Sequence, residues 1–156
     1  MTPRFGQPPR RGVVYRRRPG AYAILLGRRG VLLTRQVTPD LDELQLPGGG
    51  IDPGEAVLPA LIREVREETG HSCRIDRRLA TFRQYSWMPD YNRHAEKMCH
   101  VYLGRAGPRL GPPEEAGHSA IWCSLEAALA GLSSPGNRAV LTRFALSTRL
   151  RPRAGY

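Results

Sequence analysis

Apolar and polar positions in the first part of the chain alternate in a way that predicts two strands, a loop and a helix. Apolar runs at Ala21–Leu26 and Val31–Val37 are separated by a short segment with turn glycines, which is the spacing of an antiparallel hairpin. Leu46–Glu55 contains four glycines and two prolines, so we expect a loop there. From Leu58 to Thr69 apolar residues recur at intervals of three and four positions, which is typical of one helical face, and Gly70 follows as a helix stop.

Other apolar runs predict further strands and two more helices. Additional strands are expected at Val13–Arg16, Leu79–Tyr85, Met98–Leu103 and Ala120–Cys123. Ser124 is a candidate N-cap for a helix that ends at Ala130, and a second helix is expected after Ser134. Strands, one helix, more strands and then helices are the order of a mixed sheet covered by helices, so the predicted fold class is α/β.

Composition and charge set the two ends of the chain apart. The 156 residues suit one domain, and the net charge of +10 comes from 24 basic and 14 acidic residues. Residues 1–18 hold six arginines and residues 149–156 hold three, with no acid in either stretch. We therefore expect a flexible basic arm at 1–12, a folded domain at 13–148 and a basic tail at 149–156. Two interpretations of the basic ends stay open. They are either solvent-exposed segments without a ligand or segments that contact the phosphates of a nucleic acid.

The sequence indicates neither a membrane protein nor a protein stabilised by disulfides. The longest clean apolar run, Ala21–Leu26, is far shorter than the ~20 residues of a membrane-spanning helix. The N-terminal segment lacks the apolar stretch of a secretory signal, so we expect a soluble, cytoplasmic protein with no membrane partner. The three cysteines show no C-x-x-C spacing, which favours free thiols over a disulfide framework or a zinc site.

Three glutamates of the predicted helix share one arc of its surface. Glu64 is separated from Glu67 by three positions and from Glu68 by four, so their side chains converge. Clustered carboxylates raise one another's pKa, and a divalent cation removes that cost. Oxygen ligands of this kind suit Mg²⁺ or Mn²⁺. A charged surface helix, with Arg63 and Glu67 as an ion pair four positions apart, is the alternative that this spacing leaves open.

The wider spacing resembles the signature of a known family. Gly49, five residues, Glu55, seven residues and then the run REVREETG from Arg63 to Gly70 match the pattern G-x5-E-x7-R-E-U-x-E-E-x-G-U of the Nudix hydrolases at every polar and glycine position. The segment ends at His71, where the pattern has a bulky aliphatic residue. The resemblance implies an α/β/α sandwich and hydrolysis of a nucleoside diphosphate linked to another group.

This resemblance also implies roles for individual residues. Glu64, Glu67 and Glu68 match the metal ligands of the family, with Mg²⁺ or Mn²⁺ as the cofactor. Arg63 matches an arginine that orients the carboxylates through Glu55, whose own role is more structural than catalytic.

The general base is open between two kinds of acid. Relatives use either the residue that matches Glu64 or a further acid from a later loop, and here Glu115 or Glu114 is the best candidate, ahead of Glu96. The expected catalytic residues are therefore Glu64, Arg63 and Glu115. An ordinary surface role stays open for each of the three later acids.

Substrate contacts are expected from the glycine loop and from two basic segments. Gly49 would let a ligand approach the backbone closely, and Arg35 at the end of a strand would clamp a phosphate. Tyr85 lies in a cluster of aromatic residues with Arg83 beside it, which is a pattern for stacking a nucleobase next to a cationic phosphate contact. A solvated Arg35 and simple core packing of the aromatic cluster are the alternatives.

The leading hypothesis is Mg²⁺-dependent hydrolysis of the diphosphate linkage in a small nucleoside diphosphate derivative, either a nucleoside triphosphate or an ADP-ribose-like molecule. One alternative, suggested by the arginine-rich ends, is an RNA 5′-end pyrophosphohydrolase of the same fold. A nucleotide-binding module without turnover is disfavoured, because it would not need the three carboxylates. The expected partner is a small nucleotide rather than a nucleic acid, and many relatives are homodimers, so a second copy of the chain is a further candidate partner.

Overall fold

The computed structural model describes residues 1–149, and within that range a mixed sheet holds eight strands. The strands are β1 (Arg4–Phe5), β2 (Arg16–Gly27), β3 (Gly30–Thr38), β4 (Leu41–Gln45), β5 (Gly48–Gly50), β6 (His71–Met88), β7 (Arg93–Arg109) and β8 (His118–Cys123). Their order is β1-β6-β7-β2-β3-β4, with β5 paired to β2 and β8 paired to β3. The pairs β1–β6 and β2–β7 are parallel and the others are antiparallel, so the sheet is mixed.

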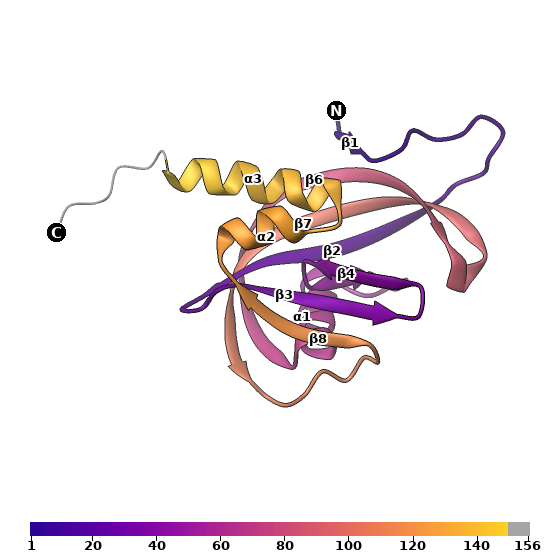
Figure 1. Ribbon diagram of the computed structural model, residues 1–156. Coiled ribbons are helices and arrows are strands. Elements are labelled where there is room, and N and C mark those ends of the chain that lie inside the picture. Colours follow the sequence, from indigo (N-terminus) through magenta and orange to yellow (C-terminus); the bar gives the residue numbers. More distant parts are fainter. Residues whose placement is uncertain (150–156) are drawn as a thin grey trace.

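Helices cover both faces of this sheet. They are α1 (Val57–Thr69), α2 (Leu125–Gly131) and α3 (Pro135–Arg149), and a short 3-10 turn, η1 (Pro89–Tyr91), joins β6 to β7. Helices α2 and α3 lie together on one side of the strands and α1 lies on the other (Figure 1). The arrangement is the predicted α/β/α sandwich. In the described part of the chain, each helix is too short or too polar to traverse a bilayer.

Consecutive residues of β2 supply the two halves of the core. Ile24 packs with Phe82 and with Leu141 of α3, whereas Leu25 packs with Leu61 of α1. Successive side chains of a strand point to opposite faces, so a strand covered on both sides is apolar throughout. Each of these side chains is fully buried, or nearly so, and contributes about 1.5–3 kcal/mol to the free energy of unfolding.

The hairpin and the central helix predicted from the sequence are confirmed. Strands β2 and β3 pair antiparallel, with Gly27 opposite Gly30 at the turn. Helix α1 begins one residue before the predicted Leu58 and ends at Thr69 as predicted. Gly70 closes it in the left-handed region, at a φ of 73°, and its N–H donates to the Arg66 carbonyl at 2.8 Å.

Four predicted segments have wrong bounds. The segment Leu46–Glu55 is not wholly a loop, because β5 within it pairs with β2 through backbone groups that need no side chains. Strands β6 and β7 extend well beyond the predicted Leu79–Tyr85 and Met98–Leu103, since their outer parts are rich in polar side chains that carry no apolar pattern. The strand expected at Val13–Arg16 begins only at Arg16.

Part of the segment expected to be a flexible arm packs on the domain. Arg4 and Phe5 pair in parallel with β6, and the Phe5 ring meets Phe82 edge-on, with the two ring centroids 5.5 Å apart. Aromatic burial of this kind holds the arm against the sheet. Of the predicted basic tail, residues 150–156 lie outside the described part of the chain.

Candidate active site

Carboxylates from helix α1 and from a distant loop meet at one end of the sheet. Glu64 and Glu67 of α1 and Glu115 of the β7–β8 loop each offer an oxygen, and these oxygens all lie within 4.8 Å of one another. Burial raises the pKa of Glu64 above its ordinary value, and the neighbouring acids add to this. We call these three residues the acidic triad.

Arg63 holds part of the triad in position. Its Nε and Nη2 donate to both carboxylate oxygens of Glu55, each at 3.0 Å, and its Nη1 donates to Glu64 at 3.2 Å and to Glu67 at 3.1 Å. These bonds keep the pKa of Glu55 below its ordinary value and raise that of Arg63. The sequence-based expectation that Arg63 orients the carboxylates and contacts Glu55 agrees with this geometry.

Gly49 allows the glycine segment to lie against the triad. A Cβ at this position would be 2.8 Å from Cδ of Glu64, closer than real Cβ contacts allow. Only glycine therefore lets strand β5 touch this carboxylate without moving it. A ligand bound along β5 would be in direct reach of Glu64.

Backbone hydrogen bonds bring Glu115 to the helix. The N–H groups of Glu114 and Glu115 both donate to the Glu67 carbonyl, at 2.8 and 3.0 Å. This carbonyl lies in the last turn of α1, where helix carbonyls lack partners within the helix. Of the other proposed acids, Glu114 is exposed and lies 4.0 Å from Arg66, and Glu96 lies 3.9 Å from Arg83. The structure thus brings Glu115 alone of the three later acids into the cluster.

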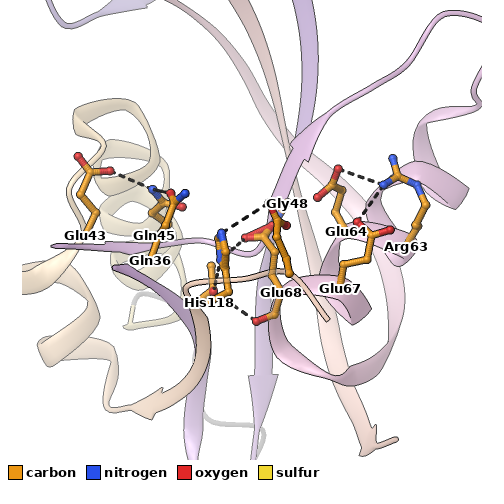
Figure 2. A network of polar contacts seen from close by, with 11 residues as sticks. Gln36, Glu43, Gln45, Gly48, Arg63, Glu64, Glu67, Glu68 and His118 are labelled. Carbon is orange, nitrogen blue, oxygen red and sulfur yellow. Dashed lines mark hydrogen bonds and ion pairs between the residues drawn. The ribbon is translucent and has the colours of Figure 1, made fainter. Parts of the chain in front are cut away.

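Glu68 lies outside the triad in this structure. Its carboxyl accepts a hydrogen bond from the Gly48 N–H at 3.0 Å and lies 3.3 Å from Nδ1 of His118, whereas Glu64 and Glu67 face Arg63 (Figure 2). Burial raises the pKa of Glu68 to about 9. The Glu68 side chain thus does not face the other expected metal ligands in this structure. Its role as a metal ligand stays a prediction.

The contact of Glu68 with His118 was not anticipated from the sequence. His118 also lies 2.9 Å from the Thr34 hydroxyl, and its own pKa is lowered by burial. A histidine at the start of a strand carries no pattern that would identify it as the neighbour of a glutamate 50 residues earlier. Only the pairing of β3 with β8 brings the two together.

The acidic triad fits a hard divalent cation. The donors are all carboxylate oxygens, they face one another, and Arg63 is the one cation within the described residues that bonds to more than one of the triad's carboxylates. Carboxylates at such distances repel, which Mg²⁺ or Mn²⁺ would relieve. The site therefore suits the cofactor expected from the sequence.

A cavity of about 300 Å³ opens beside the glycine segment. Its walls include Gly48, Phe82 and the amide side chains of Gln36, Gln45 and Asn137. Gln45 donates to Gln36 at 3.1 Å, so these amides form a fixed polar wall (Figure 2). Asn137 is buried, and among residues 1–149 none donates a hydrogen bond to its Oδ1. An unpaired buried carbonyl oxygen is costly, so this atom is ready to accept a bond from a ligand.

Three expected substrate contacts lie away from this cavity. Arg35 is exposed and forms a two-bond ion pair with Asp42, at 2.8 and 2.7 Å. Arg83 and Tyr85 alternate with the cavity residue Phe82 along β6, so they point to the other face of the sheet. Gly49 was predicted from the sequence and Asn137 was not, because an asparagine at the start of a helix has no distinguishing pattern.

The chain is similar to known proteins over most of its length. A family model described as "NUDIX domain" matches residues 16–144. A protein of Mycolicibacterium smegmatis, named 8-oxo-(d)GTP phosphatase, is 32% identical over 106 residues, which are 68% of this chain and 31% of that protein. The chain thus spans about a third of the length of that relative.

Solved structures share the whole fold. A NUDIX hydrolase from Nitrosomonas europaea has a TM-score of 0.69 at 19% identity and covers 90% of this chain and 100% of its own. A MutT protein from Methanosarcina mazei has a TM-score of 0.63 at 21% identity, over 86% of this chain and 97% of its own. At these identities the likeness establishes the fold, with the triad and the cavity as the features that bear on chemistry.

Proposed function

Since the chain belongs to the NUDIX domain family, we propose that it hydrolyses the diphosphate linkage of a nucleoside triphosphate with Mg²⁺ or Mn²⁺ as cofactor. The observation that carries this proposal is the acidic triad next to a cavity with an unpaired Asn137 carbonyl oxygen. The triad suits the metal ion and the diphosphate of the substrate, and the cavity suits its uncharged base. Gly48 and Gly49 of strand β5 connect the two.

The cavity supports a purine as the base. Phe82 offers an aromatic wall, and the amides of Gln36, Gln45 and Asn137 offer hydrogen-bond donors and acceptors in fixed positions. The M. smegmatis relative carries the name 8-oxo-(d)GTP phosphatase, which makes an oxidised guanine nucleotide the first compound to test. An ADP-ribose-like substrate is the alternative within the same reaction class.

The residues of the triad have one task in common in this reaction, which is to hold the metal ion. A bound divalent cation would neutralise the diphosphate oxygens and make a water molecule more acidic. Glu64, Glu67 and Glu115 would hold that cation, with Glu68 as a fourth proposed ligand from the adjacent position of α1. Arg63 keeps Glu64 and Glu67 in fixed orientations through the bonds described above.

We assign Glu64 as the general base, with Glu115 as the alternative. Glu64 is the acid of the triad that lies against strand β5, where the phosphates would bind. Its position against Gly49 keeps it within reach of any water that approaches a phosphate on β5.

A substrate panel tests the proposal. The purified protein would be incubated with 8-oxo-dGTP, dGTP, dCTP, ADP-ribose and 5′-triphosphorylated RNA, with Mg²⁺, Mn²⁺ or EDTA, and the products separated by anion-exchange chromatography. We expect cation-dependent turnover of the purine triphosphates, and its loss in the Glu67→Gln variant. Turnover restricted to ADP-ribose or to the RNA would replace the proposal by the corresponding alternative, and turnover in EDTA would remove the cation from it.

A further inference from the structure

The guanidinium of Arg18 occupies the space that a side chain at position 50 would fill. A Cβ built on Gly50 would lie 2.6 Å from Nη2 and 2.9 Å from Nε of Arg18. The absence of a side chain at this position therefore lets a cation lie directly on strand β5. This point is one residue beyond Gly49, whose backbone touches Glu64.

An aromatic ring fixes this cation from the tip of the β6–β7 hairpin. The Cζ atom of Arg18 lies 4.9 Å from the centroid of the Tyr91 ring, and that of Arg93 lies 5.5 Å from the same centroid. Both distances are within the ~6 Å range of a cation–π interaction. Because two guanidinium groups engage the ring, Tyr91 anchors cations and is not free to stack on a nucleobase.

A second cation faces the same space. Arg18 and Lys97, the sole lysine of the chain, line a cavity of about 170 Å³ together with Gly49, Gly50 and Met88. Within residues 1–149, no carboxylate lies within ion-pair distance of either cation. Two positive side chains without anionic partners around one small cavity match an oxyanion.

We propose that this cavity binds the phosphate group of the substrate that lies farthest from the nucleoside, and that Arg18 selects for that group. The inference rests on the proposed function, which puts the base in the Asn137 cavity. Gly48 lines the Asn137 cavity, whereas Gly50 lies under Arg18. The two cavities share Tyr22, Lys97 and Cys99 in their walls, so one ligand can extend from the first into the second, and Gly49 between them lies against Glu64. We therefore place the diphosphate at Gly49 and the terminal phosphate at Gly50.

This arrangement selects between the two substrate classes left open above. A nucleoside triphosphate brings a charged terminal phosphate to Arg18 and Lys97, which both bind it. An ADP-ribose-like molecule brings an uncharged sugar to the same point and leaves both cations unpaired. The cavity therefore favours substrates with a free terminal phosphate.

Binding of inorganic pyrophosphate tests the cavity separately from hydrolysis. Pyrophosphate would be titrated by calorimetry into the wild-type protein and into Arg18→Gln, with saturating Mg²⁺ in both cases. Loss of one charge-assisted contact should weaken binding about tenfold or more. Arg17→Gln is the matched control, since Arg17 is the exposed neighbour on the same strand and points to the other face. Equal affinities of the wild type and Arg18→Gln would overturn the proposal.

Two further variants address Arg18 through its neighbours. Gly50→Ala should reduce pyrophosphate affinity as Arg18→Gln does while leaving the melting temperature nearly unchanged, because the new methyl group would displace only the guanidinium end of Arg18 and no backbone atom. Tyr91→Phe should retain affinity, because the ring remains, and Tyr91→Leu should lose it. Wild-type affinity in both Gly50→Ala and Tyr91→Leu would contradict the geometry proposed for Arg18.

Steady-state kinetics separate this inference from the proposed function. In Arg18→Gln, KM for a nucleoside triphosphate should rise about tenfold, and KM for the matching diphosphate should rise much less. If the wild type turns over the triphosphate normally and Arg18→Gln raises KM equally for the triphosphate and the diphosphate, or for neither, the inference is overturned and the proposed function stands. Arg18-dependent pyrophosphate binding without turnover of any nucleotide would overturn the proposed function and leave an anion-binding cavity at Arg18.

Discussion

The Glu68 carboxyl lies 3.3 Å from Nδ1 of His118 and is turned away from the acidic triad. Both side chains are nearly inaccessible to solvent, with exposed fractions of 3% and 4%. Burial raises the pKa of Glu68 to about 9 and lowers that of His118, so at neutral pH an uncharged carboxyl group meets an uncharged imidazole. In the metal-free protein this is a polar contact between neutral groups, and it joins β8 to the end of α1.

This state of Glu68 predicts a pH dependence of stability without metal. Between the ordinary glutamate value and about 9, the folded protein keeps a proton that the unfolded chain releases. The free energy of unfolding therefore falls as pH rises through this window. Glu68→Gln removes the titration, so its melting temperature in EDTA should exceed that of the wild type by a margin that widens toward pH 9 and reaches several degrees.

Thermal denaturation from pH 5 to pH 9 checks this expectation. Glu126→Gln, at an exposed site on α2, is the control and should differ from the wild type by a constant amount. Parallel curves for Glu68→Gln and the wild type would show that Glu68 is already ionised in the folded protein.

Glu115 should couple the β7–β8 loop to the metal site. With Mg²⁺ at ~100 times its dissociation constant, binding stabilises the folded state by about 2.7 kcal/mol. Glu115→Gln should lose most of this thermal shift and reduce kcat about 100-fold. Glu114→Gln changes the adjacent exposed acid and should retain both. Identical magnesium-induced shifts in the two variants would exclude Glu115 from the site.

Asn137 should affect substrate affinity more than the rate of chemistry. Asn137→Leu removes the unpaired buried oxygen, so the melting temperature should be unchanged or higher. KM for a purine nucleoside triphosphate should rise about 10- to 100-fold with kcat nearly constant. Arg143→Gln, on the same helix but at a different cavity, serves as control. A fall in kcat with an unchanged KM would assign Asn137 a different role.

Gly136 should be intolerant of any side chain. A Cβ at this position would lie 2.2 Å from Cε2 and 2.4 Å from Cζ of Phe82, whose ring is buried in the core. Such overpacking costs about 1–3 kcal/mol, although alanine's better helix propensity recovers up to ~1 kcal/mol. Gly136→Ala should therefore melt several degrees lower, whereas Gly111→Ala, with nothing within 4 Å, should not. Unchanged melting of Gly136→Ala would show that α3 can shift away from Phe82.

Local spacing along the chain predicted the part of the site that one helix builds. Glu64 and Glu67 converge because a helix brings residues three positions apart to one side, and Arg63 reaches both from the same turn. Gly70 ends that helix for an equally local reason, its positive φ. All of these features depend on helix α1 alone, so its own sequence is enough to predict them.

Tertiary packing determined the rest of the site. Glu115 was the expected catalytic acid, but Glu114 stayed a candidate beside it, since the choice depends on which side chain the docked loop turns toward α1. Arg83 and Tyr85 alternate regularly with Phe82 along β6, but the sequence could not reveal which face of β6 borders the cavity, because that depends on how α3 packs on the sheet. Asn137 acquires its role only when α3 packs over Phe82.

The attachment of the β7–β8 loop to the Glu67 carbonyl has a consequence for how freely this loop can vary. Both anchoring contacts come from main-chain amides, which every residue except proline provides. Substitutions at Leu110–Pro113 should thus be tolerated without displacing Glu115. Proline at position 110, 114 or 115 is the exception. The Leu110 N–H also donates to the Gly70 carbonyl, at 2.8 Å, so each of these prolines would remove one main-chain bond that holds the loop to the end of α1.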